Sequence, residues 1–110
     1  MAKATFWQRG EALDYRNTGN AIIEANTIVV YGTKIGVVGC DIAPGESGAL
    51  HVEGVFSLPK ASGAINAGAA VYWDATNNNI TSTESGNTAA GFAAQAAAAG
   101  DTAVLVKINA

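Results

Sequence analysis

The feature that most constrains the fold is an alternating run, from Leu50 to Leu58, that ends in proline. One parity of this run is apolar and the other is largely polar: Leu50, Val52, Phe56 and Leu58 against His51, Glu53 and Ser57. Successive side chains of a strand point to opposite faces, so the run predicts one half-buried strand with an apolar inner face. Pro59 lacks an N–H donor and is expected to end the regular pairing.

Other short apolar segments, separated by turn residues, extend this pattern along the chain. Asn, Gly and Pro favour turn conformations, and they delimit five further predicted strands: 21–31, 35–42, 71–74, 80–83 and 104–108. The pair 71–74 and 80–83 is predicted to form a hairpin. We therefore expect an all-β fold, a small β-barrel or sandwich of short antiparallel strands. Residues 10–110 would form this single domain, and residues 1–9 an N-terminal arm.

The alanine-rich segment 89–100 allows two interpretations. Alanine has the highest helix propensity, which favours a helix over 93–99. Gly91 and Gly100 bracket the segment, and no stripe of large apolar residues runs along it, which favours a strand from Gly91 followed by a turn. We favour the strand and turn, with a helical turn as the alternative.

The two halves of the chain echo each other. Ile23–Val30 resembles Ile65–Tyr72 in its apolar and turn positions, and Gly36–Gly45 has the spacing of Gly91–Gly100. Each half then ends with an alternating strand. We hypothesise two related β units; the alternative is that turns and strands recur in any small β-protein.

The composition indicates a thin core. Hydrophobic residues make up 49% of the 110 residues and aromatic residues 7%, and the many alanines among them bury little area. A small domain with a thin core commonly depends on disulfides, metal or partner subunits. The single cysteine, Cys40, excludes an intrachain disulfide, and one Cys with one His (His51) is too few for a closed zinc site. Self-association is the support that remains.

The charges argue against nucleic acid and membrane as partners. The net charge is −3 and the six cations are scattered, whereas nucleic-acid binding needs a concentrated positive footprint. No apolar run approaches the roughly 18 residues of a membrane-spanning helix. No apolar leader follows Met1, so we expect the chain to stay in the cytoplasm where it is made.

The sequence offers almost no catalytic equipment. Gly45–Ala49 lacks the final glycine of a nucleophile elbow, so a turn is favoured there. Tyr31–Lys34 has the residue types of a phosphate-binding loop in the wrong order. Cys40 lies among small and apolar residues with no cation predicted beside it, so an inert buried thiol is expected. We expect no catalytic, cofactor-binding or metal-binding residues, and therefore no enzyme.

Aromatic residues are the strongest candidates for contacts with other molecules. Tyr72 and Trp73 would lie on opposite faces of a strand, so one ring would fill the core and the other would cover a subunit boundary. Phe6 and Trp7 have no clear place in the structure of the arm itself. We expect them to anchor an interface, with Arg9 nearby.

A second hypothesis is a ligand site on the face of Tyr72–Asp74, completed by His51 and Glu53. Such a site needs polar groups from several strands to converge in one concavity. For His51 and Glu53, which share one parity, a solvated polar face is favoured over a binding role.

Several short motifs occur one after another along nearly the whole chain, and their order is more specific than any one of them. The most specific are the segments 53–60 (Glu-Gly-Val-Phe-Ser-Leu-Pro-Lys) and 71–74 (Val-Tyr-Trp-Asp), and the others are Gly36-Val37-Val38, Pro44-Gly45-Glu46, Ala67-Gly68, Gly91-Phe92-Ala93 and the closing strand 104–108. This order resembles the bacteriophage capsid cement, or head decoration, family. Members are often labelled RecA/RadA-family phage recombinases, but such an ATPase needs a Walker loop and a longer α/β domain, and this chain shows neither.

The resemblance implies a β-barrel-like protein, typically trimeric, on the outside of an icosahedral phage head. Such proteins add to the expanded shell at local three-fold positions and reinforce it. The implied partners are the major capsid protein and further copies of the chain, and the implied location is the virion surface. No catalytic residues come with the resemblance.

Overall fold

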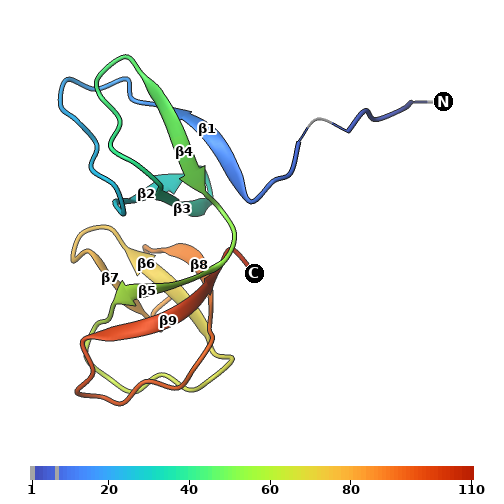
Figure 1. Ribbon diagram of the computed structural model, residues 1–110. Helices are drawn as coiled ribbons and strands as arrows, with labels where there is room; N and C mark the ends of the chain where they lie inside the picture. The colour runs from blue at the N-terminus through green and yellow to red at the C-terminus, as the bar shows by residue number, and fades with distance from the viewer. Residues whose placement is uncertain (1, 7) are drawn as a thin grey trace.

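Two antiparallel β-sheets form the body of the protein (Figure 1). The computed structural model describes residues 2–6 and 8–110, and these contain no helix. The described residues contain nine short strands: β1 (Ala12–Arg16), β2 (Ile28–Tyr31), β3 (Lys34–Val38), β4 (Ser47–His51), β5 (Val55–Pro59), β6 (Ala70–Asp74), β7 (Asn79–Thr81), β8 (Thr88–Ala93) and β9 (Ala103–Ile108). The described residues before β1 lie outside both sheets and extend away from the body (Figure 1).

Each sheet belongs to one half of the chain. The N-terminal unit, residues 12–52, forms a sheet in the order β1-β4-β3-β2, and the C-terminal unit, residues 55–109, forms one in the order β5-β9-β8-β6-β7. The expectation of an all-β fold with short antiparallel strands is confirmed. The two sheets pack as in a sandwich, and neither closes into a barrel.

The alternating run from Leu50 to Leu58 is not one strand, so that prediction is wrong. β4 ends at His51 and β5 begins at Val55, and these two strands belong to different sheets. Gly54 lies between them with a φ of 124°, a conformation open to glycine and closed to most other residues. The alternation survives the break because both strands direct the same parity inward, as the burial of Leu50 and Leu58 shows.

The alanine-rich segment forms strand and turn, and the helical alternative is wrong. β8 ends at Ala93, and Ala97 then forms an isolated antiparallel bridge with Ile65. Both alanines are buried in the core. Small side chains let these backbone segments approach closely, which outweighs the weak preference of alanine for helix. The β6–β7 hairpin is confirmed, while the predicted strand 21–31 shortens to Ile28–Tyr31.

The two units share one strand arrangement, which confirms the internal repeat. β1, β4, β3 and β2 of the N-terminal unit correspond to β5, β9, β8 and β6 of the C-terminal unit, and the pairing order is the same in both. Among the strands of residues 2–6 and 8–110, β7, at the outer edge of the second sheet, is the one without a counterpart. Recurrent turns alone would not reproduce this order, so the alternative explanation fails.

Hydrogen bonds repeat at equivalent positions of the two units. Ile23 and Ile42 exchange backbone hydrogen bonds of 3.0 and 2.8 Å, and Ile65 and Ala97 do so at 2.9 and 2.8 Å. The Asn26 N–H donates to Val38 O at 2.7 Å, and the Gly68 N–H donates to Ala93 O at 2.8 Å. Asn26 and Gly68 both have positive φ, 71° and 80°. The echo in the sequence therefore records a shared backbone geometry.

Asn17 and Lys60, two buried polar side chains, also occupy equivalent places. Asn17 follows β1, and Lys60 follows β5. The Asn17 amide donates to the carbonyls of Ala21 and Ile42 at 2.8 and 2.9 Å. The Lys60 ammonium donates to three backbone carbonyls, at 2.9 Å to Ala61, 3.4 Å to Ala99 and 3.5 Å to Asp101. Each side chain thus donates hydrogen bonds to backbone carbonyls of the loops around it.

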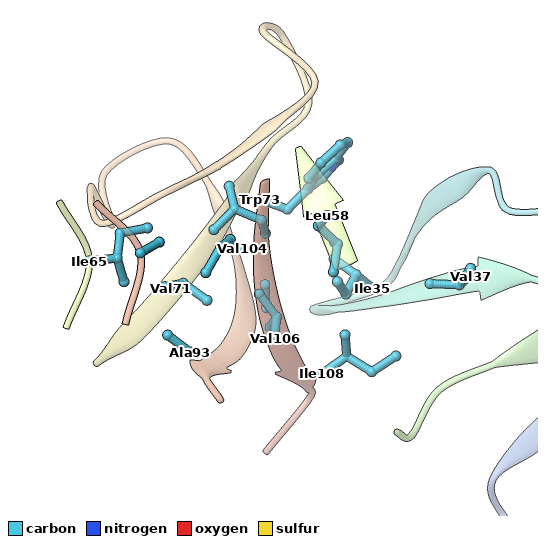
Figure 2. Packing of buried hydrophobic residues seen from close by; sticks show 13 residues of the cluster. Ile35, Val37, Leu58, Ile65, Val71, Trp73, Ala93, Val104, Val106 and Ile108 are labelled. Carbon is cyan, nitrogen blue, oxygen red and sulfur yellow. The ribbon is translucent and has the colours of Figure 1, made fainter. Parts of the chain in front are cut away.

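The core of the C-terminal unit extends into the N-terminal unit. Its cluster contains Leu58, Val71, Trp73 and Ile108, and it also includes Ile35 and Val37 of β3 (Figure 2). A smaller cluster of Val38, Ile42 and Leu50 belongs to the N-terminal unit alone. Because the larger cluster spans both units, we keep the prediction that residues 10–110 form one domain.

The side chain of Asn109 links the two units by hydrogen bonds beside this core. Its Nδ2 donates to Ile35 O at 2.7 Å and to Val52 O at 2.9 Å, and its Oδ1 accepts from the Ile35 N–H at 3.1 Å. Its φ of 58° lies in the left-handed region, which asparagine tolerates better than most residues. A single side chain after the last strand therefore holds backbone groups from β3 and from the link after β4.

Candidate functional site

The N-terminal arm presents an aromatic side chain to solvent. Phe6 is 83% exposed and Arg9 is exposed, and the arm reaches away from both sheets (Figure 1). Trp7, the third residue expected in this interface, lies outside the described residues. A large apolar ring exposed on an extended segment is suited to burial against another molecule.

Tyr72 and Trp73 lie on opposite faces of β6, as the alternation predicts. Trp73 is 5% exposed and belongs to the core of the C-terminal unit, whereas Tyr72 is half-buried on the outside. The Tyr72 hydroxyl donates to Glu84 Oε2 at 3.2 Å, and this hydrogen bond to a carboxylate raises the pKa of Tyr72. We therefore retain only Tyr72 of this pair as an interface candidate.

Asp74 is occupied by the turn that follows β6. Its Oδ1 accepts from the backbone N–H groups of Thr76 and Asn77 at 2.9 and 3.1 Å, and its Oδ2 accepts from Asn77 Nδ2 at 2.8 Å. The hydrogen bonds from Asn77 lower the pKa of Asp74 because they stabilise the charged form. These contacts give Asp74 a local structural role in the hairpin.

His51 and Glu53 line an open hollow at the link between the two units. It encloses about 320 Å³ and is also lined by Glu11, Gly54 and Lys107. Tyr72, Trp73 and Asp74 do not line it. The five residues of the ligand-site hypothesis therefore do not converge in one concavity, and this geometry does not favour that hypothesis.

The remaining chemical candidates do not form a reaction centre. Cys40 is exposed, so the expectation of a buried thiol is wrong: β3 ends at Val38, and the chain leaves the sheet before the cysteine. Ser47 begins β4 and pairs with Arg16. Within residues 2–6 and 8–110, no group of three or more His, Cys, Asp or Glu side chains is placed to hold a metal ion. No helix in this part of the chain could cross a membrane.

The structure reveals two apolar surfaces that the sequence reasoning missed. An open hollow of about 230 Å³ in the N-terminal unit is lined by Leu13, Tyr31, Lys34, Val52 and Asn109. We call it the mouth of the N-terminal unit. The second surface, the outer face of the C-terminal unit, carries Val55, Tyr72, Phe92 and Leu105. The match between Ile23–Val30 and Ile65–Tyr72 continues for one more residue and aligns Tyr31 with Trp73. This alignment indicated that Tyr31 lies on the inner face of its unit, where the first surface is found.

The fold and surfaces described so far define a small all-β protein built from two repeated units, with an exposed arm and apolar contact faces. The family model for phage cement proteins matches residues 7–108 of the chain. The chain therefore belongs to the phage cement protein family, which places it on the capsid of the virion as a structural component. None of the curated proteins and none of the solved structures compared with the chain matches it.

Proposed function

We propose that this protein binds the outer surface of the expanded phage head as a trimer, at local three-fold positions, and stabilises the shell. The family match over residues 7–108 carries this proposal. The major capsid protein and further copies of the chain would be its partners. The protein would be made in the host cytoplasm and act as a structural component without catalysis.

The exposed arm supports a role in attachment. Phe6 is 83% exposed and lies on an extended segment before β1. Burial of a Phe side chain contributes roughly 1.5–3 kcal/mol, so one such anchor gives weak binding after the cost of lost translational and rotational freedom. Three arms on one trimer would act together, and such linkage raises affinity by about 10²–10⁴-fold over a single contact.

The experiment is co-sedimentation of purified protein with expanded heads that lack it. Deleting residues 2–9 should lower occupancy on heads, while the thermal unfolding of the body changes little because the described residues of this segment lie outside both sheets. The matched control deletes residues 2–5 only, which shortens the arm and keeps Phe6, Trp7 and Arg9. Equal occupancy of the full-length and 2–9-deleted proteins would contradict the role of the arm.

A further inference from the structure

Equivalent positions on the inner faces of the two units differ in burial. In the C-terminal unit Trp73 is 5% exposed and Leu58 is 1% exposed. Their counterparts in the N-terminal unit, by strand pairing, are Tyr31 and Tyr15; Tyr31 is 45% exposed and Tyr15 is half-buried. The side chains are aromatic or apolar in both units, so the difference comes from what covers them.

The inner face of the C-terminal unit is covered by β7, whose buried Ile80 pairs with Trp73 and bridges to Lys60, and by the neighbouring unit. Ile35 and Val37 of β3 are 0% and 5% exposed and belong to the same cluster as Leu58, Trp73 and Ile108 (Figure 2). They come from the side of the N-terminal sheet opposite to Val38 and Leu50. The intrachain contact is therefore asymmetric, since the outer face of one unit closes the inner face of the next.

The N-terminal unit has no such neighbour within the described chain. Its mouth, the hollow of about 230 Å³ described above, is lined by Leu13, Tyr31, Lys34 and Val52 of this unit and by Asn109, which follows β9 of the C-terminal unit. Val52 stands at the position of Ile108, and Leu13 at that of Phe56. Ile35 and Val37 pack on the inner face of the C-terminal unit, whereas the equivalent inner face of the N-terminal unit is left open at the mouth.

The outer face of the C-terminal unit is the second surface without a partner in the described chain. Phe92 lies at the position of Val37, and Phe92, Tyr72 and Leu105 are half-buried there, while Val55 is 55% exposed. The solvent-facing side of an antiparallel sheet is normally polar. Lys107 lies within this group, directly opposite both Val55 and Phe92 in the strand pairing, with its Nζ 5.9 Å from the centroid of the Phe92 ring.

We propose that a second copy of this chain docks the outer face of its C-terminal unit over the mouth of the N-terminal unit. The contact between copies would then continue the contact that already joins the two units within one chain. The two open surfaces are the complementary ends of a head-to-tail interface, and such interfaces close into rings when the rotation permits. The inference rests on the self-association in the proposed function, and a ring of three copies would contain six alternating β units.

Two substitutions test the two surfaces of this interface independently. Tyr31→Asp places a carboxylate in the mouth, and Leu105→Asp places one on the outer face; each should raise the dissociation constant for self-association by about a hundredfold or more, because an unpaired charge is costly to bury. Ile22→Asp is the matched control, since Ile22 is 54% exposed and lines neither surface. Val55→Asp is the second outer-face variant if Leu105→Asp does not fold, as circular dichroism would show.

The decisive measurement is light scattering on the two variants, alone and mixed. Each variant alone should have the mass of one chain, whereas an equimolar mixture should form a dimer, because one copy keeps its outer face and the other keeps its mouth. A wild-type monomer at all concentrations, a variant that assembles as wild type does, or a mixture that stays monomeric would overturn the inference. Co-sedimentation with heads is scored separately, so loss of head binding by an intact oligomer would count against the proposed function alone.

Discussion

Replacing Asn109 with alanine should destabilise the whole body, because this side chain joins the two units. It makes three hydrogen bonds, two to Ile35 backbone groups and one to Val52 O, over 2.7–3.1 Å. At a net contribution of about 1 kcal/mol each, their loss costs roughly 3 kcal/mol. The φ of 58° adds about 1 kcal/mol, since alanine is strained in the left-handed region. We expect the free energy of unfolding to fall by about 4 kcal/mol.

Chemical denaturation followed by circular dichroism measures this change, and two further variants divide it. Asn109→Gly removes the same hydrogen bonds but accepts the positive φ, so it should be about 1 kcal/mol more stable than Asn109→Ala. Asn109→Asp keeps an acceptor for the Ile35 N–H and loses both donors. Measurements at several protein concentrations separate this effect from self-association. An alanine variant within about 0.5 kcal/mol of wild type would refute the reasoning.

The remaining predictions concern a glycine and a carboxylate. Gly91→Ala should lower the free energy of unfolding by about 3 kcal/mol or more, because a Cβ there would lie 2.0 Å from Lys107 O at a φ of 126°. Gly100→Ala, with nothing within 4 Å, is the control and should stay within about 0.5 kcal/mol of wild type in the same denaturation assay; equal losses would contradict the clash. For Asp74, whose pKa is lowered in the folded state, stability is present above the ordinary value of 3.8 and is lost as pH falls through the folded pKa. The unfolding free energy of wild type should therefore exceed that of Asp74→Asn at neutral pH, with the gap closing below pH 3.8; a gap unchanged across that range would show that the charge does not matter.

The local sequence pattern was enough to predict most strands, but it did not predict where the chain passes from one sheet to the other. The all-β class, the β6–β7 hairpin and the internal repeat were all predictable, because alternation and turn residues act over a few positions. The run from Leu50 to Leu58 misled the prediction at Gly54, where the chain leaves one sheet and enters the other. Alternation shows which side chains are buried. Because β4 and β5 bury the same parity in their two sheets, the alternating pattern does not reveal that the chain passes from one sheet to the other between them.

The contact surfaces were predictable only in part. Exposure of Phe6 and the opposite orientations of Tyr72 and Trp73 follow from the sequence, since one lies on an arm and the others alternate on a strand. The mouth at Tyr31 and the outer face at Phe92 were not predicted. Both depend on which unit covers the other, a relation between residues far apart in the chain.

The sequence by itself determined the all-β class and the scarcity of catalytic groups, and it suggested two related β units, because strand periodicity, turn residues and side-chain chemistry are local properties. Only the tertiary structure decided that Ile35 and Val37 close the C-terminal unit while the mouth beside Tyr31 stays open. The two units have nearly equivalent inner faces, so their patterns do not distinguish the covered face from the free one. The asymmetry arises when one unit packs on the other, and it leaves the mouth of the N-terminal unit open and the outer face of the C-terminal unit uncovered.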